Sequence, residues 1–456
     1  MSHVLRVLLL FLIGVIGTGA PGVRAQPERA DTLTATAAVR QALTENPTVQ
    51  AVRQQRAAAA ASVREARRAW LPVVQGQAQY RRLSNNVDYT VDLPSGAGQQ
   101  PVTFAPAILD RYALRATIEQ PVFTGRRVPS RVTAARAETR AAQAQLASTR
   151  SDVAYRARAA YWRLYEARAR RRAAADALRL LERRLTDVQN ERAAGRATEA
   201  EVLRVQARRD QIRVERIQAR TAAVSARRAL NDQRGRPLDA PVVLADTVTV
   251  DSAVALPSDP VPTARAQRSD LDALRQTVRA RAAAVQEAQA GWFPQVSLIA
   301  STLYARPNEQ LFPPEDRFQT TWEAGVTLSW RLSVGTGAAT DRAQARRQQA
   351  QYELRDRQRA VAVEVRDQVE NVGQAREAVQ AATTSVESAR AAYRATQSRY
   401  EAGMAVVSDL LDAERALREA RAALATAQAD YALAQAALDR ALGRPPLPDT
   451  TDNPQP

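Results

Sequence analysis

The pattern of apolar and polar residues along the chain changes its period several times. Long segments rich in Ala and Arg, both good helix formers, are typical of uninterrupted helix. Four short segments instead alternate apolar and polar residues one by one, which predicts strands with one apolar face. The chain is therefore expected to be mainly helical with four strands.

The four strands come in two pairs, expected at 71–83 with 111–123 and at 292–305 with 318–332. In the first strand Val74 and Tyr80 lie on one face, and Gln residues alternate with them on the other. Aromatic residues stand toward the segment ends, as in strands that cross a bilayer. A half-buried hairpin in a soluble sandwich is the alternative, but the pattern offers no further strands to pack on it.

The sequence contains an internal repeat, because matching motifs recur at a nearly constant offset. The strand pairs both open with a Trp-x-Pro step, at Trp70 and Trp292. Gly195 and Gly403 each interrupt a long helical run and predict a turn. Matching Gly-Arg-Pro segments follow at 235–237 and 443–445. The first repeat is expected at 26–236 and the second at 263–444, joined by a Pro-rich connection at 237–262.

Each repeat reads as helix, strand, strand, long helix, turn and returning helix. The opening helices are expected at 32–69 and 263–290, and the long ones run from about Arg131 to Gly195 and from about Ala338 to Gly403. At 1.5 Å per residue each long helix measures roughly 100 Å, so two shorter helices stacked end to end match it, with Gly-Arg-Pro at the joint. Abundant Ala permits close helix approach, which predicts a thin-walled helical assembly rather than a thick core.

The first 25 residues are typical of a signal peptide: Arg6 precedes an apolar run and a small-residue cleavage site follows. No later segment is apolar enough for a transmembrane helix, so export without a helical anchor is expected. Residues 445–456 are expected to form a flexible tail. Because the chain has no Cys and only His3, thiolate, imidazole and their metal sites are missing from the mature protein. We expect no enzyme activity, no metal and no cofactor.

The formal net charge is +17, and Arg supplies all 65 basic residues. A basic surface for nucleic acid is one interpretation. Export, and the even spread of Arg among Glu and Asp along helices, favour a solvated helix surface instead. We therefore expect no nucleic-acid partner.

Four strands cannot close a barrel, and unpaired backbone at an open sheet edge is not tolerated in lipid. At least two chains must therefore share one barrel. The paired Trp-x-Pro strand entries, the two helical hairpins turning at Gly195 and Gly403, and the two-fold repeat resemble the TolC-type outer-membrane efflux protein family. The resemblance implies a homotrimer with a twelve-stranded barrel in outer-membrane lipid, continued by an α-helical barrel through the periplasm. It also implies two partners, a periplasmic adaptor protein and an inner-membrane pump of the RND or ABC type.

On this interpretation the chain passively conducts substrates to the exterior, and the even-numbered strand faces meet lipid. The inserts at 84–110 and 306–317 become extracellular loops, and the glycine turns become the periplasmic tip. The expected pore-lining residues are Gln75, Gln77, Gln79, Arg115, Glu119 and Glu323. The expected adaptor-docking residues are Gly195, Arg196, Ala197, Gly403, Met404 and Ala405.

Family members carry two acidic residues, six and nine positions after the second turn glycine, around the periplasmic aperture. Asp409 and Asp412 occupy these positions, and three chains would bring six carboxylates to a narrow opening that attracts cations. The alternative is helix capping, in which Ser408 caps the returning helix and the acids oppose its dipole. Both roles are compatible.

In some family members a Tyr before the second glycine bonds an acid after the first and holds the tip closed. Tyr400 and Glu201 match these positions, whereas Ala405 replaces the basic residue of the related contact. A capping box between Thr198 and Glu201 is the alternative role for this Glu.

The main rival function is an exported coiled-coil scaffold or adhesin that transports nothing. A periplasmic adaptor of the membrane-fusion type would instead show one hairpin and a lipoyl-like β-domain, neither of which the sequence indicates. An enzyme lacks support, because the sequence has no phosphate-binding Gly loop and no nucleophile pair.

Overall fold

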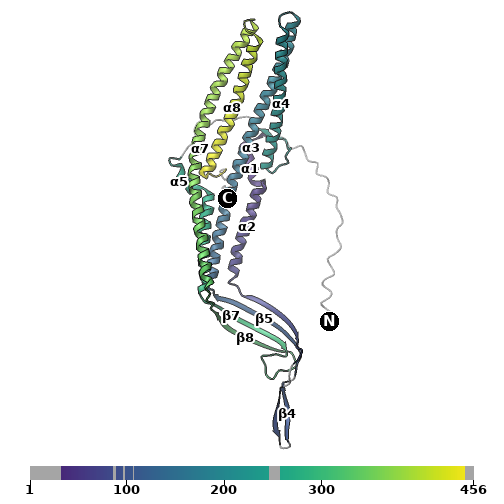
Figure 1. Cartoon of the computed structure of the whole chain (residues 1–456), viewed down its shortest axis with the longest axis vertical. Coiled ribbons are helices and arrows are strands. Elements are labelled where there is room, and N and C mark those ends of the chain that lie inside the picture. The colour runs from purple at the N-terminus through teal and green to yellow at the C-terminus, as the bar shows by residue number, and fades with distance from the viewer. Residues whose placement is uncertain (1–31, 86–88, 96–97, 106, 246–256, 447–456) are drawn as a thin grey trace, which may run out of the picture.

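The computed structural model describes residues 32–446 except 86–88, 96–97, 106 and 246–256. Figure 1 shows an elongated molecule with a bundle of long helices at one end and a sheet at the other. The expected signal peptide, and the expected tail apart from Pro445 and Pro446, lie outside the described residues.

Two long helices give the molecule its length. Helix α3 (Arg127–Ala193) and helix α7 (Gly335–Glu401) each contain 67 residues. Each turns at a glycine and returns as a shorter helix, α4 (Glu199–Gln233) after α3 and α8 (Val407–Leu442) after α7. The structure therefore confirms the predicted fold class, a mainly helical chain with two repeats of strands, long helix and returning helix.

The half of the wall nearer the sheet is completed by the opening helices of the repeats. The structure divides both of them, where the sequence predicted single runs. The first becomes α1 (Ala35–Glu45) and α2 (Pro47–Arg68), because Pro47 cannot supply the amide hydrogen that helix continuation requires. The second becomes α5 (Pro260–Gln267) and α6 (Ser269–Gln289), followed by the 3₁₀ turn η1 (Ala290–Trp292), so α5 begins inside the expected connection.

The joints between stacked helices are built alike in the two repeats. Asn46, between α1 and α2, is buried and donates to the carbonyl of Gln233 at the end of α4 over 3.1 Å. Arg268, between α5 and α6, is buried and donates to the carbonyl of Ala441 at the end of α8 over 3.2 Å. One polar side chain therefore ties each joint to the Gly-Arg-Pro end of the returning helix.

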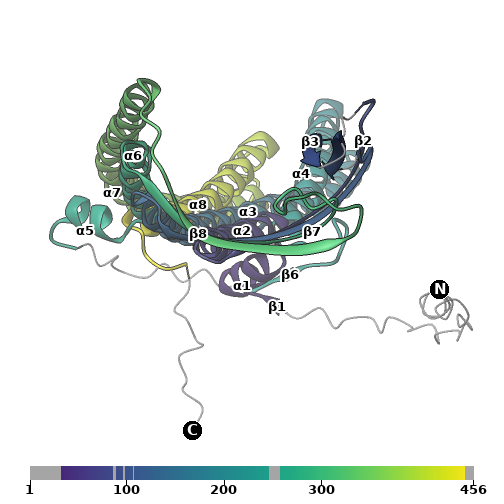
Figure 2. The ribbon, with the colours of Figure 1, turned by 90° about the horizontal axis from the view of Figure 1, so that it is seen from below.

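Packing is thin, as the abundance of Ala predicts. Helix α3 runs through the middle of the wall, where it packs on α4 and α8 toward the tips and on α2 and α6 toward the sheet. Figure 2 shows the helices and the sheet following one curved wall, with α1 and a two-stranded sheet on its convex side. That small sheet pairs β1 (Thr32–Leu33) in parallel with β6 (Val243–Leu244), and Tyr161 of α3 donates to the Leu33 carbonyl over 3.1 Å.

The main sheet has four antiparallel strands in the order β2-β5-β7-β8. They are β2 (Val73–Arg82), β5 (Asp110–Phe123), β7 (Gln295–Arg306) and β8 (Gln319–Ser329). Within the described chain, the outer edges of β2 and β8 have no strand partner. The sheet is therefore open on both sides.

The insert at 84–110 differs from the expected loop. It contains an antiparallel hairpin of β3 (Tyr89–Ser95) and β4 (Gly98–Ala105), which extends beyond the main sheet in Figure 1. The four expected strands form the main sheet, and this hairpin adds two strands outside it that were not expected. The insert lacks long period-two alternation, so its pairing was not evident from the pattern.

Candidate functional site

The two helical tips have the same backbone construction. Gly195 and Gly403 adopt positive φ, at 69° and 72°, which side chains rarely tolerate. The amide after each glycine donates 2.8 Å to the carbonyl five residues earlier, Arg196 to Glu191 and Met404 to Arg399. Glycine thus closes both helices with a Schellman motif and sends the chain back.

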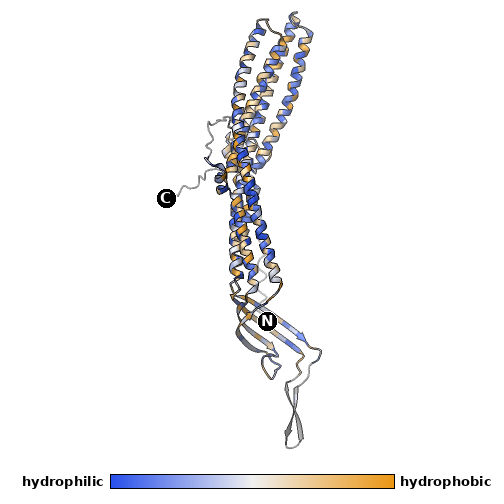
Figure 3. Ribbon diagram, turned by 60° about the vertical axis from the view of Figure 1, so that its left-hand side comes forward, coloured by the Kyte–Doolittle hydropathy of each residue, from blue (hydrophilic) through white to orange (hydrophobic). Residues whose placement is uncertain are grey.

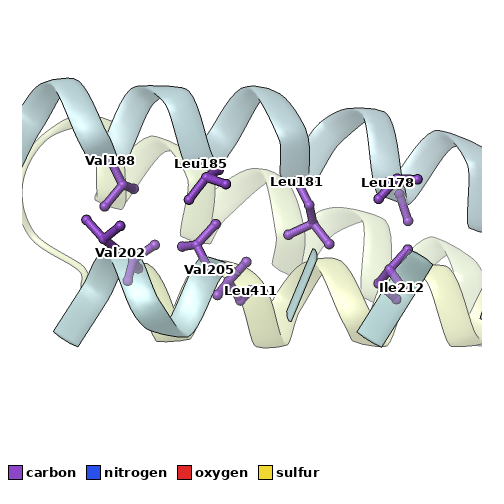
Figure 4. Close-up of a cluster of buried hydrophobic side chains, with 10 residues drawn as sticks. Leu178, Leu181, Leu185, Val188, Val202, Val205, Ile212 and Leu411 are labelled. Atoms are coloured by element: carbon purple, nitrogen blue, oxygen red, sulfur yellow. The ribbon is translucent and has the colours of Figure 1, made fainter. Parts of the chain in front are cut away.

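The tips are held together by an apolar cluster that joins three helices. Leu181, Leu185 and Val188 of α3 pack against Val205 of α4 and Leu411 of α8. Figure 4 shows these side chains pointing toward one another between the helices. Figure 3 shows apolar and polar residues interspersed along the whole length of the helices. The tip of the second repeat is therefore packed on the first, although its own turn stays exposed.

The first tip contains the capping box that was the alternative role of Glu201. The Thr198 hydroxyl accepts from the Glu201 amide, and the Glu201 carboxylate accepts from the Thr198 amide over 2.8 Å. These hydrogen bonds lower the pKa of Glu201 because they stabilise its ionised form. Glu201 is consequently occupied within its own turn.

The expected pairing of Tyr400 with Glu201 is corrected by the structure. The Tyr400 hydroxyl donates to Glu191 at the end of α3 over 3.1 Å. The Arg184 guanidinium lies over the Tyr400 ring, 4.1 Å from its centroid, which is cation–π geometry. Burial, opposed by Arg184 and reinforced by the Glu191 hydrogen bond, raises the pKa of this Tyr. Tyr400 therefore ties α7 to α3 through residues that the family pattern did not indicate.

The second tip lacks a side-chain cap, so the structure contradicts the alternative in which Ser408 caps the returning helix. The N-cap of α8 is Val406, which has no hydroxyl, and Ser408 lies inside the helix. Asp409 stands at the position in the repeat that Glu201 occupies in the first tip, since each lies six residues after its turn glycine. Without a capping partner, the Asp409 carboxylate makes no hydrogen bond or ion pair among the described residues.

Asp409 and Asp412 lie on one exposed face of α8, because residues three apart in a helix are neighbours. The opposite face carries Leu410 and Leu411, which are buried. Arg415 approaches Asp412 to 3.7 Å, and both side chains remain more than half exposed. Arg415 was not predicted as a site residue, although its spacing of three from Asp412 indicates the pair. The acidic face of the tip is thus partly balanced by one Arg.

The predicted pore-lining residues share one face of the main sheet. Pairing aligns Gln75 with Thr117, Ser301 and Glu323, and residues in register lie on the same side. Arg115 lies diagonally across from Glu323, at 3.6 Å between nitrogen and oxygen, and Ser301 donates to the same carboxylate over 2.8 Å. The other predicted pore-lining residues on this face are Gln77, Gln79 and Glu119. A hollow of about 250 Å³ opens on it, bordered by Gln77, Arg115 and Leu303.

The opposite face of the sheet is apolar and exposed. Trp322 is 79% exposed and Val326 is 68% exposed, although the surface of both side chains is mainly apolar. The same face carries Val74, Tyr80, Tyr112, Leu114, Ile118, Leu298, Tyr304 and Leu328, all exposed. Tyr80, Tyr112, Tyr304 and Phe318 gather at one end with ring centroids 4.9–6.0 Å apart. Trp330, which donates to the Trp292 carbonyl, marks the other end.

In the described parts of the chain, no helix is long and apolar enough to cross a bilayer, and no group of three or more potential metal ligands occurs. Residues 38–236 and 261–444 match the family model described as "Outer membrane efflux protein". A segment of 160 residues is 31% identical to the alkaline protease secretion protein AprF of Pseudomonas aeruginosa. That match spans 34% of this chain and 33% of AprF.

Two solved structures show the extent of the fold similarity. The MtrE outer membrane channel of Neisseria gonorrhoeae, in its open state, superposes with a TM-score of 0.74 at 20% identity, over 90% of this chain and 89% of that one. The CmeC outer membrane channel of Campylobacter jejuni superposes with a TM-score of 0.72 at 14% identity, over 95% and 94%. At these identities the likeness concerns the fold.

Proposed function

The chain belongs to the outer membrane efflux protein family of TolC-type channels, whose model matches both of its repeats, and from this membership we propose its mode of action. It is the channel-tunnel of a tripartite efflux or secretion system, passively conducting substrates from the periplasm or an inner-membrane pump to the exterior. The observation that carries this proposal is the division of one curved sheet into an exposed apolar face and a polar face, continuous with a long helical wall.

The sheet would become a barrel by joining copies of the chain. In the part of the chain that the structure describes, strands β2 and β8 have unpaired outer edges, and such edges are costly in lipid. Trimers, the assembly that the family implies, would give twelve strands and a lumen wider than side chains fill. The apolar face then meets lipid, and the face with Gln75, Arg115 and Glu323 lines the pore.

The periplasmic gate is proposed at the second tip. Asp409 is exposed and uncapped, and Asp412 stands one turn further on the same face. Three copies would place six carboxylates near the narrow end, where a ring of negative charge attracts cations and repels anions. Arg415 would moderate this charge at Asp412.

Tyr400 is proposed as a positioning residue of the gate rather than as part of its charge. Its hydroxyl binds Glu191 of α3, and its ring lies under Arg184 of the same helix. These contacts hold the end of α7 against α3, and opening of the tip would require this attachment to loosen. Glu201 would contribute by keeping the first turn capped.

Single-channel recording in planar lipid bilayers tests this function with the full chain. Wild-type protein is expected to conduct, with cations preferred. Asp409→Ala combined with Asp412→Ala should lower the cation preference, and Tyr400→Phe should raise conductance or the frequency of opening. A matched control removes two exposed acids from α7, Glu370→Ala with Glu377→Ala, which should change little because they lie away from the tip.

Several outcomes would contradict the proposal. A non-transporting scaffold or adhesin predicts no conductance by the wild-type chain. Equal ion selectivity in the tip and control variants would remove the gate role of the two Asp residues. If Tyr400→Phe left gating unchanged, the positioning role of Tyr400 would be excluded, and the role of the two Asp residues would be unaffected.

An adaptor is proposed to dock on the two turns, which expose backbone and small side chains. Met404 is 66% exposed beside Gly403, and the matching turn exposes Gly195 and Arg196, whereas Ala197 and Ala405 are half-buried. Pull-down of the chain from native membranes should recover a periplasmic adaptor and an RND or ABC pump. Recovery of neither would overturn the proposed docking of an adaptor.

The local similarity to a protease secretion protein favours protein secretion as a second candidate function. The identity of the recovered pump would distinguish secretion from efflux.

A further inference from the structure

A cavity of about 490 Å³ lies on α3 halfway along the helical wall, between the two joints of the stacked helices. Both repeats contribute to it, α1 and α2 from the first and the start of α6 with the end of α8 from the second. Its most frequent charged lining residue is arginine. The six that line it are Arg40, Arg53, Arg150, Arg268, Arg440 and Arg444, against only two carboxylates, Asp152 and Asp270.

Three of the six arginines are neutralised by acidic partners. Arg268 binds Asp270 at 2.9 Å, and Arg440 binds Asp152 at 2.6 Å. Arg444 binds Asp439, also at 2.9 Å. Both carboxylates that line the cavity are therefore already engaged.

The other three arginines form no ion pair with a carboxylate among the described residues. Arg40 and Arg53 stand exposed at the rim, and Arg53 makes only long hydrogen bonds of 3.4 Å, to Gln50 and to the Leu43 carbonyl. Arg150 is half-buried on α3, and its Nε is buried without a hydrogen-bond partner. A buried donor without a hydrogen-bond partner is destabilising, so an acceptor placed there would be stabilising. Ser148 and Ser151 add hydroxyl groups beside it.

We propose that this cavity binds a compact oxyanion carrying at least two negative charges, of the phosphate or carboxylate type. Guanidinium groups present paired donors that match both kinds of oxyanion in a bidentate manner, and they stay charged at any physiological pH. Three uncompensated positive charges around one hollow favour a polyvalent anion over chloride. The volume suffices for a small organic anion.

The position of the cavity indicates that this ligand is distinct from the transported substrate. Figure 2 places α1, which supplies Arg40, on the convex side of the wall, so the ligand would enter from the side opposite the proposed lumen. The floor is α3, which lies in the middle of the chain's wall rather than at its edges. The proposal thus stands independently of conduction, and binding is measurable without it.

Isothermal titration calorimetry with the full chain in nonionic detergent tests the proposal, with pyrophosphate and citrate as probes and ionic strength held constant with chloride. Saturable binding of at least one probe, at one per chain, is expected. Arg40→Gln with Arg150→Gln should weaken it at least about tenfold, since hydrogen bonds to charged groups contribute about 1.5–3 kcal/mol each. Arg140→Gln, an exposed arginine of the same helix outside the cavity, should leave binding unchanged.

Absence of saturable binding of both probes would overturn the proposal, and so would equal affinity in the double variant and in Arg140→Gln. Size-exclusion chromatography and circular dichroism establish that the variants fold. Should the double variant fail to fold, Arg53→Gln at the rim decides: weaker binding supports the site, and unchanged binding excludes it. Preference for pyrophosphate or for citrate identifies the phosphate or the carboxylate class.

Discussion

At the scale of single residues, Arg268 and Asp270 form a largely buried ion pair in the helical wall. Arg268 is 5% exposed and donates both to Asp270 and to Glu364. Arg357 of α7 reaches the same Asp270 carboxylate at 2.8 Å. The network joins α6 to α7 at the joint, beside the buried apolar cluster that contains Leu271, Val361 and Val365. Removing one member leaves buried charge behind, which is costly.

The pKa of Asp270 makes this contact testable. Burial acts to raise it, but the hydrogen bonds and charges of Arg268 and Arg357 outweigh burial and lower the pKa to about 2. A lowered pKa in the folded state stabilises the protein above the unfolded value near 3.8, and this contribution disappears as pH falls toward 2. Asp270→Asn should therefore cost about 2 kcal/mol at neutral pH.

Thermal unfolding of Asp270→Asn and wild type at several pH values measures this difference. We expect it to be constant from pH 7 to about pH 5 and to shrink below pH 4. The control is Asp272→Asn in the same turn, since Asp272 has no arginine partner among the described residues and should show a smaller difference. A loss of stability that does not depend on pH would contradict the assignment.

At the scale of elements, the glycines that end the helices differ in what requires them. All have positive φ, but only some are also in close contact with another helix. Gly195 and Gly235 both adopt positive φ, but a Cβ on Gly195 would meet nothing within 4 Å. A Cβ on Gly235 would lie 2.9 Å from the Glu45 carbonyl oxygen, because α4 ends against the joint between α1 and α2. Gly443 is similarly close to Arg268 in the second repeat.

Substitution by Ala should therefore lower the free energy of unfolding by different amounts at Gly195 and Gly235. Gly195→Ala should cost about 1–2 kcal/mol for the left-handed backbone alone. Gly235→Ala should cost more, because the neighbouring backbone must also move. Unfolding of the two variants side by side measures this, and equal losses would show that the joint accommodates the added methyl group.

The motifs that mark helix ends were predictable from sequence, whereas the partners of their side chains were not. Gly403 could be located because a helix-breaking residue acts locally and the repeat has a matching turn at Gly195, and Tyr400 and Asp409 could be located by their spacing from Gly403 in the family pattern. Glu191 could not be predicted as the partner of Tyr400, since it depends on how α7 lies across α3. Val406 replaces the capping Thr198 of the first repeat, and this difference is visible in the sequence once the tips are aligned.

At the scale of the whole molecule, the two faces of the main sheet differ in their expected tolerance of charge. Ile118 is exposed on the apolar face, and Thr117 lies next to it on the polar face, in register with Glu323 through Ser301. Arg on a lipid-facing strand costs about 2–4 kcal/mol at the membrane midplane and less toward the interfaces. Ile118→Arg should thus reduce the amount of assembled protein.

Thr117→Arg is the matched control, because it adds the same charge one residue away. The yield of trimer extracted from outer membranes measures both variants. The interpretation of the faces requires a marked loss for Ile118→Arg and little loss for Thr117→Arg. The reverse order would assign lipid to the face that carries Gln75 and Arg115.

The sequence by itself determined the two-fold repeat, the four main strands with their two faces, the long helices and their glycine turns. Each depends on local periodicity or backbone preference, which residues close together in the sequence are sufficient to determine. The same local information indicated the division between polar and apolar strand positions. It also located the carboxylates of the second tip.

Only the tertiary structure decided where helices break against one another and which charges meet. The joints at Asn46 and Arg268, the attachment of Tyr400 to Glu191, and the cavity that gathers arginines from both repeats all join residues far apart in the chain. The β3–β4 hairpin likewise arises from pairing rather than from a strong pattern. Such contacts depend on the relative placement of elements, which helix and strand periodicity leave open.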